Sequence, residues 1–74
     1  MYILSSLKKN QTAVVRNLYG GQRFISRVSA MGFTLGVAVT MVQNNGSGPV
    51  LVYLRDTQVA LGAREASLIE IERR

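Results

Sequence analysis

The chain has 74 residues, a formal net charge of +5, and neither cysteine nor histidine. This length predicts a single domain over residues 1–74 with a thin core, and the missing residue types exclude disulfides and catalytic pairs of the Ser-His or Cys-His kind. The longest apolar run, residues 37–42, is far shorter than the ~20 residues that cross a bilayer, and the N-terminus lacks the basic and long apolar regions of a secretory signal.

The first part of the chain predicts a short lead-in followed by a strand. Residues 3–7 suit one helical turn, and residues 8–11 form a polar turn in which Asn10 tolerates a left-handed backbone. Alternation of side chains then predicts a strand over residues 13–18. We expect Ala13 and Val15 on its core face, and on its other face Val14, Arg16 and Leu18.

A helix is predicted next, between two glycine signals. The pair Gly20-Gly21 interrupts the preceding strand, and Gly32 supplies the left-handed residue that ends a helix over residues 22–31. Arg23 and Arg27 lie four residues apart and share a face of this helix. Its apolar stripe consists of Phe24, Val28 and Met31, with Ile25 beside them.

Three further strands are predicted in the middle of the chain. Residues 37–42 are apolar on both faces, so both faces are expected to be at least half buried. The loop 44–49 is rich in Asn and Gly and predicts a hairpin to a strand at 50–54. A turn at 55–57 then leads to a short strand at 58–61.

The last segment predicts one helical turn over residues 62–67 and a closing strand over 68–72. Alternation in that strand places Ile69 and Ile71 in the core and leaves its two glutamates in solvent. The chain is therefore expected to be mostly β, with about five strands, one helix after the first strand and a helical turn before the last. A small SH3-like barrel fits this pattern best, because closing the sheet hides its edges.

Charge is distributed unevenly along the chain. Residues 1–55 carry six basic side chains and no acidic one, whereas residues 56–74 carry four acidic and three basic side chains. Such a domain is expected to prefer an acidic partner surface, a phosphate or an anionic membrane face. A simpler reading is that scattered Lys and Arg keep a small apolar protein in solution.

Several short motifs, in order and at their spacing, resemble the ferrous iron transport protein A (FeoA) family. The clearest is the segment 27–36, which is similar to the family's helix end with its Gly-Leu-x-Pro-Gly turn, although Leu35 stands where the family has Pro. The others are Leu4 with Leu7, Ala13-Val14-Val15 with Gly20-Gly21, Gly48-Pro49-Val50, Gln58 to Leu61 with Glu65-Ala66, and Leu68 to Ile71. The resemblance covers nearly the whole chain and implies an SH3-like barrel.

The resemblance also implies a function. It describes a cytoplasmic accessory or regulatory protein of ferrous iron uptake that binds FeoB, a membrane transporter with a cytosolic GTP-binding domain. Such a protein is recruited to the inner face of the membrane through its partner, without inserting into the bilayer. The sequence adds that no enzyme activity, cofactor or metal site is expected, because its four carboxylates and three methionines are not clustered.

We hypothesise that the predicted helix and the turn after it contact this partner. Arginines and exposed apolar side chains are the usual anchors of protein interfaces. The expected contact residues are Arg23, Arg27, Val28, Met31 and Leu35. The competing interpretation is that Val28 and Met31 belong to the core, since they lie on the apolar stripe.

Other binding functions remain open at this point. A basic SH3-like barrel could bind nucleic acid through its cationic region, but the five aromatic residues are not clustered as a stacking platform, so no nucleic acid partner is expected. A groove for proline-rich peptides is disfavoured because the chain has no Trp. Edge strands could also pair to form a weak homo-oligomer.

Overall fold

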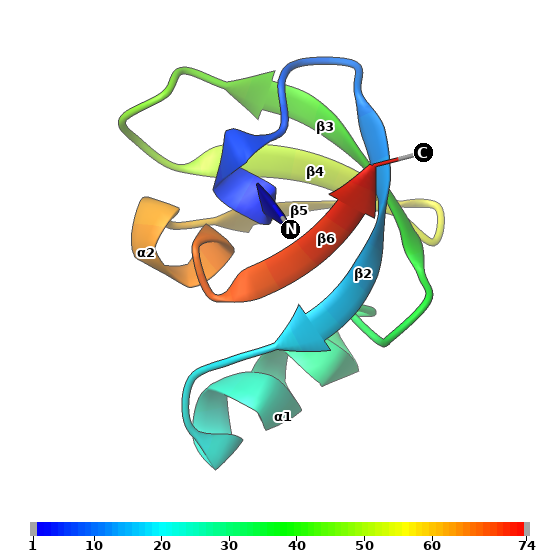
Figure 1. Ribbon diagram of the computed structural model, residues 1–74, viewed down its shortest axis with the longest axis vertical. Coiled ribbons are helices and arrows are strands. Elements are labelled where there is room, and N and C mark those ends of the chain that lie inside the picture. Colours follow the sequence, from blue (N-terminus) through cyan, green and yellow to red (C-terminus); the bar gives the residue numbers. More distant parts are fainter. Residues whose placement is uncertain (1, 74) are drawn as a thin grey trace.

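The computed structural model describes residues 2–73 (Figure 1). The elements follow the order of the chain as β1 (Tyr2–Ile3), the 3-10 helix η1 (Leu4–Ser6), β2 (Thr12–Leu18), α1 (Gln22–Ala30), β3 (Ala38–Asn44), β4 (Val50–Leu54), β5 (Thr57–Leu61), α2 (Ala63–Ala66) and β6 (Ile69–Arg73). The predicted helical lead-in, the helix, the hairpin loop and the helical turn are all confirmed, with boundaries within about two residues of those expected.

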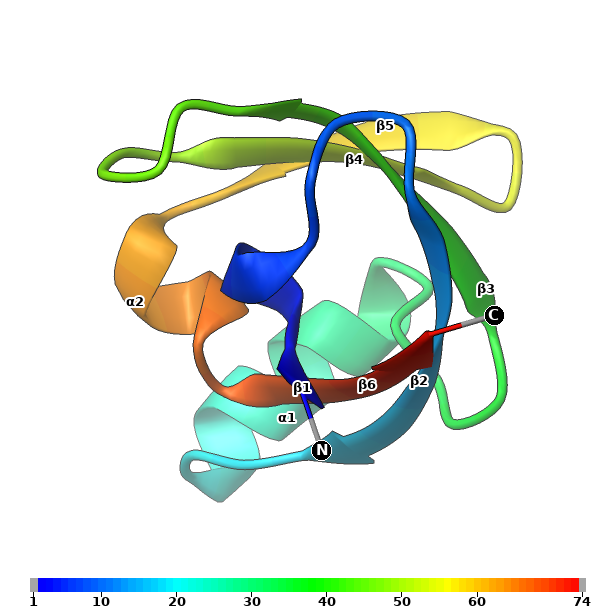
Figure 2. The same cartoon turned by 45° about the horizontal axis from the view of Figure 1, so that its top comes forward.

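The strands form one antiparallel sheet in the order β1-β6-β2-β3-β4-β5. Strand β2 is shared, because it pairs with β6 along one edge and with β3 along the other. Figure 2 shows the sheet curling around the core, with α1 behind it and with η1 and α2 beside β6. The protein is therefore a small SH3-like barrel, as expected. Its additional strand, β1, has two residues, too few to show any alternation in a sequence.

The core lies inside the curl of the sheet and is entirely hydrophobic within residues 2–73. Its largest fully buried side chain is Phe33, which lies three residues beyond the end of α1. Inward positions of β3, β4 and β6 alternate with outward ones, as a half-buried strand requires. The other core residues are Leu4, Leu7, Ala13, Val15, Val28, Val39, Met41, Val50, Val52, Leu54, Val59, Leu61, Ala66, Ile69 and Ile71.

Two details of the predicted strands are wrong. Leu18 was expected on the outer face of β2, but it is half-buried against the core, opposite Ile69. The pairing of β2 with β6 shifts between Val15 and Asn17, and this bulge moves the following residue to the other face of the sheet. The outer face of β3 is also more open than expected, because Ala38 is exposed.

Left-handed residues shape two tight turns, one between η1 and β2 and one in the hairpin of β4 and β5. Asn10 has φ of 70°, the left-handed backbone predicted for it, and its N–H donates to the carbonyl of Met41 at 2.7 Å. Arg55 and Asp56 both have positive φ, 49° and 64°, and they alone separate β4 from β5. Positive φ at both positions defines the turn type whose twist matches a two-residue hairpin.

One side chain connects the lead-in to the sheet. A second bulge, between Met41 and Gln43, sets Asn44 opposite the buried Val50. The Asn44 amide nitrogen donates to the carbonyls of Ser5 and Leu7 at 2.9 and 2.8 Å, and its oxygen accepts from the Gly46 N–H at 2.9 Å. This amide therefore positions η1, with the core residue Leu4 in it and Leu7 directly after it, over β3.

We predict that Asn44→Ala destabilises the protein by about 1–3 kcal/mol, because it leaves two carbonyl groups without their donor. Urea unfolding followed by far-UV circular dichroism measures the change. Asn45→Ala is the matched control, since Asn45 is exposed in the adjoining loop and its loss should cost little. Equal stability of the two variants would contradict this role for Asn44.

Candidate partner-binding face

Helix α1 is bounded by backbone geometry at both ends. It begins after Gly20, whose φ is +97°, and a side chain there would press on Phe24 and Leu68. It ends in a Schellman motif, in which the N–H of Phe33 donates to the carbonyl of Val28 and that of Gly32 to Ser29, both at 3.0 Å. Gly32 has φ of +112°, a conformation that side chains rarely adopt. The motif turns the chain so that Phe33 enters the core beside Val28.

The turn after the helix presents Leu35 to solvent. Its side chain is 66% exposed, more than any other large hydrophobic side chain of residues 2–73. The backbone on both sides is held, because Gly36 N–H donates to Val15 at 2.8 Å and Val37 N–H donates to Thr34 at 3.1 Å. An exposed apolar side chain on an ordered backbone is suited to contact a partner, since the backbone loses little conformational entropy on binding.

The structure separates the five residues that were expected to contact a partner. Val28 is 0% exposed, so it belongs to the core and its inclusion among the contact residues is corrected. For Val28 the competing interpretation is confirmed, because the apolar stripe of the helix faces inward and the Val28 carbonyl accepts from the Phe33 N–H in the Schellman motif. Met31 is half-buried against the core and offers part of its surface. Arg23 and Arg27 are exposed on α1, and Leu35 is exposed in the turn beyond it.

Arg27 is held by an ion pair that links the two helices. Its guanidinium donates to the Glu65 carboxylate on α2 and lies 5.8 Å from the centre of the Phe24 ring. The other oxygen of Glu65 accepts from the Gly62 N–H at 2.9 Å. The Gly62 N–H, and after it Arg27, hold the pKa of Glu65 below its usual range. Arg27 and Glu65 are separated by 37 residues in the chain, so no sequence pattern could have predicted that they form an ion pair.

Each of the four Asp and Glu side chains has a donor among residues 2–73. Besides Glu65, Glu72 pairs with Arg16 at 2.7 Å, Glu70 accepts from the Tyr19 hydroxyl at 2.9 Å, and Asp56 accepts from the Tyr53 hydroxyl at 2.9 Å. The hydrogen bonds to Glu70 and Asp56 raise the pKa of Tyr19 and of Tyr53 respectively. Within residues 2–73, the cations without a carboxylate partner are Lys8, Lys9, Arg23, Arg55, Arg64 and Arg73.

The described residues show neither a metal-binding cluster nor a membrane-spanning helix. No group of three or more Asp or Glu side chains lies close enough among residues 2–73 to hold a metal ion. No helix in that part of the chain is both long and apolar enough to cross a bilayer. What the surface offers is binding chemistry, namely free cations and one prominent apolar side chain.

We predict that the link between α1 and α2 weakens in acid. Since folding lowers the pKa of Glu65, the stability that this group contributes is present above its ordinary value of 4.5 and is lost as pH falls through its lower, folded value. Urea midpoints measured from pH 7 to pH 2.5 should therefore fall less steeply with acid in Glu65→Gln than in the parent protein. Glu72→Gln, which removes an exposed surface pair, is the control and should leave the slope nearly unchanged. Identical slopes for the parent and Glu65→Gln would contradict the assignment.

Comparison with known proteins places this barrel in a family. A sequence profile described as the FeoA domain matches residues 3–73. A protein of Methanocaldococcus jannaschii named for Fe(2+) transport protein A is 26% identical over 72 residues, covering 97% of this chain and 87% of that protein.

Solved structures agree with the fold. The crystal structure of an iron uptake regulatory protein (FeoA) has a TM-score of 0.93 at 20% identity and covers 99% of this chain and 97% of that one. Stenotrophomonas maltophilia FeoA, a zinc complex described as an SH3 domain protein, has a TM-score of 0.82 at 30% identity, with 97% and 91% covered. A manganese-dependent transcriptional repressor shares the fold over 41% of its own length, with a TM-score of 0.89 at 16% identity. The profile match spans nearly the whole chain, and the protein therefore belongs to the FeoA family.

Proposed function

We propose that this protein is a cytoplasmic accessory factor of ferrous iron uptake that binds the cytosolic part of an FeoB-type transporter. The family match over residues 3–73 supports a role in ferrous iron transport. The name of the Methanocaldococcus relative supports the same role, and the Stenotrophomonas relative is described in terms of ferrous iron transport activation. The absence of His and Cys agrees with a role in binding rather than catalysis.

The observation that carries the proposed contact is the exposure of Leu35 on a turn with a fixed backbone. We define the α1 face as Arg23, Arg27, Met31 and Leu35. It combines a free guanidinium, a second one held by Glu65, and apolar surface from the helix end. Arginine beside apolar surface is the usual composition of an interface centre, and the unneutralised cations favour an acidic partner surface.

Nucleic acid binding is less well supported. Three tyrosines are exposed and could in principle stack on bases. However, the hydroxyls of Tyr19 and Tyr53 donate to Glu70 and Asp56, which sets a carboxylate beside each ring. A phosphate backbone would be repelled from both positions. Protein–protein contact therefore remains the better proposal.

We predict that Leu35→Ala weakens capture of the purified protein by a solubilised FeoB-type transporter about tenfold, since a leucine buried at an interface contributes roughly 1.5–3 kcal/mol. Thr34→Ala is the control, because Thr34 is exposed on the same turn and the substitution leaves Leu35 in place. The assay is repeated with GDP and with a non-hydrolysable GTP analogue. Wild-type affinity of Leu35→Ala would exclude Leu35 from the contact, and failure of the parent to bind would overturn the proposed function.

We further predict that Arg23→Glu weakens the same capture more than Lys9→Glu does. Both substitutions lower the net charge by two, but Lys9 lies in the loop before β2 and outside the α1 face. The comparison separates a local contact from attraction by the whole molecule. Equal losses at low salt that both vanish at ~0.5 M salt would indicate long-range attraction alone.

A further inference from the structure

A second surface, separate from the α1 face, lies at strand β5. In the sheet order β5 is terminal, and its described pairing is with β4. The two-residue turn makes Leu54 and Thr57 a hydrogen-bonded pair, so Thr57, Val59 and Leu61 direct their backbone groups toward β4. It follows that Gln58 and Ala60 direct their N–H and C=O groups away from the sheet. Among residues 2–73 no other backbone segment bonds to these groups.

The strand has none of the features that keep edge strands from pairing. It is five residues long, Thr-Gln-Val-Ala-Leu, with no charged side chain and no proline. Natural sheets usually protect such an edge with Lys, Pro or a bulge, and the register of β4 with β5 is regular throughout. An unprotected edge of this kind is a template for one more strand.

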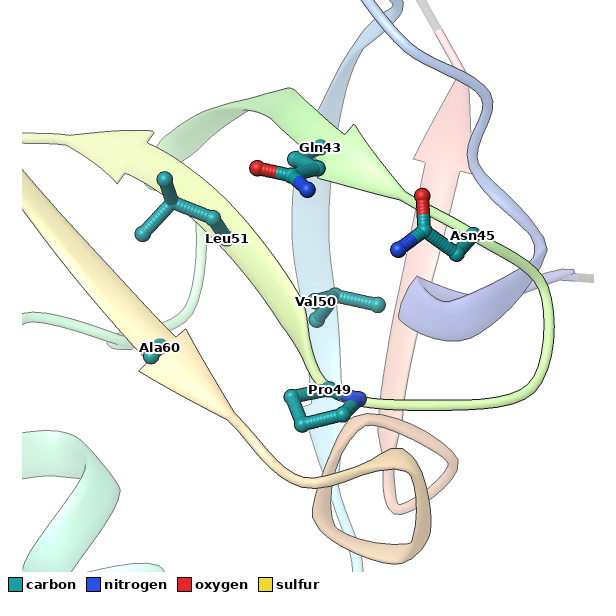
Figure 3. A pocket seen from close by; sticks show the side chains of 6 residues that line it. All are labelled: Gln43, Asn45, Pro49, Val50, Leu51 and Ala60. Atoms are coloured by element: carbon teal, nitrogen blue, oxygen red, sulfur yellow. The ribbon is translucent and has the colours of Figure 1, made fainter.

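A hollow lies beside this edge on the outer face of the sheet. Its volume is about 350 Å³, at the lower end of the range for small binding sites. Figure 3 shows Gln43, Leu51 and Ala60 side by side on β3, β4 and β5, in agreement with the strand register. Pro49 and Asn45 of the hairpin loop border the hollow, and Val50 contributes to its lining. The lining is thus mainly apolar, with two amide side chains and no charged group.

The hollow and the free edge fit the same ligand. A strand added to β5 would lie about 4.8 Å away, and its residue opposite Ala60 would project on the outer face toward Leu51. Binding by strand addition draws affinity from backbone hydrogen bonds and specificity from pockets for alternate side chains. Gln58 and Ala60 supply the backbone hydrogen-bonding groups, and the hollow supplies a pocket for a side chain.

We propose that β5 binds an extended segment of another protein by strand addition, with one apolar side chain of that segment in the hollow. The segment is uncharged where it faces β5, because no charged side chain lines the hollow. Beyond the strand lies Arg64, an exposed cation of α2 without a carboxylate partner among the described residues. An acidic residue therefore follows the uncharged stretch at that end.

A second copy of this chain is the less suitable occupant. Antiparallel pairing of two β5 strands about Val59 would bring the turn of one copy, Arg55 and Asp56, beside the Arg64 helix of the other at both ends of the contact, and Asp56 already accepts a hydrogen bond from Tyr53 in its own copy. Each copy also carries a net charge of +5. Repulsion between two copies of the same net charge disfavours this pairing, whereas a segment with an acidic residue is attracted to this surface. This surface is separate from the α1 face and does not depend on the proposed function.

The test uses capped six-residue peptides titrated into the ¹⁵N-labelled full chain. Each peptide alternates Thr with one variable apolar residue (Val, Leu, Met or Phe) and carries Asp at one or the other end. We expect saturable chemical-shift changes centred on the amides of Gln58 and Ala60, and hydrogen exchange of these two amides slowed about tenfold at saturation. Shifts centred on α1, or no saturable binding by any peptide up to ~5 mM, would overturn the proposal.

Two substitutions at one position distinguish strand addition from simple apolar contact. Ala60→Pro removes an N–H that β4 does not use and blocks the edge, and proline is tolerated at such positions. We expect at least a tenfold loss of peptide affinity in Ala60→Pro and a change within about twofold in Ala60→Ser, which keeps the N–H. Wild-type affinity of a folded Ala60→Pro would overturn the proposal.

Should Ala60→Pro fail to fold, the peptide provides the same test. N-methylation of the peptide residue opposite Ala60 removes the N–H that would donate to the Ala60 carbonyl, while the protein stays unchanged. We expect this peptide to bind at least tenfold more weakly than its parent, and equal binding would overturn the proposal. Replacing the peptide Asp by Asn should cost affinity in the parent protein but not in Arg64→Gln, which tests the charged contact separately.

Discussion

The join between α1 and β3 is the constraint on which the rest of the structure depends. Phe33, the largest fully buried side chain, reaches the core only because Gly32 takes a left-handed backbone and the Schellman motif reverses the chain. The same turn bonds Gly36 to Val15, which aligns the start of β3 with β2. The backbone of this turn is hydrogen-bonded to β2 and the Phe33 ring is buried in the core, so the Leu35 side chain between them is exposed to solvent. The exposure of Leu35, on which the proposed contact rests, is thus a consequence of how the barrel is built.

Electrostatics underlies the proposed preference of this barrel for acidic partners. All four carboxylates are engaged by donors within the fold, two by arginines and two by tyrosine hydroxyls. Such surface pairs contribute little stability each. Their larger effect is on the electrostatic field around the protein, since the other Lys and Arg side chains of residues 2–73 have no carboxylate partner in that part of the chain. A net charge of +5 then acts over the whole surface of a small protein and favours acidic partners.

The small size of the domain and the end of its sheet at β5 have two further consequences. A domain of this size buries a limited fraction of its surface, so single connections such as the Asn44 amide between η1 and β3 contribute a noticeable share of stability. Among residues 2–73 the sheet also ends at β5, and the backbone groups of β5 that point away from β4 lie next to an uncharged hollow. The helical face and the strand edge offer two chemically different kinds of contact.

The sequence alone determined the features that rest on local physics. The apolar run over residues 50–54, the alternation over 68–72, the glycine that ends α1 and the left-handed Asn10 follow from spacing and backbone preference, and they suffice to indicate the barrel. Only the tertiary structure decided what depends on neighbours distant in the chain. Pairing with β6 places a bulge in β2 and turns Leu18 inward, burial against Phe33 removes Val28 from the surface, and Glu65 takes up Arg27. Each of these outcomes requires a contact between segments that are distant in the chain. Spacing in the sequence does not predict such contacts, because they depend on how the folded segments pack against one another.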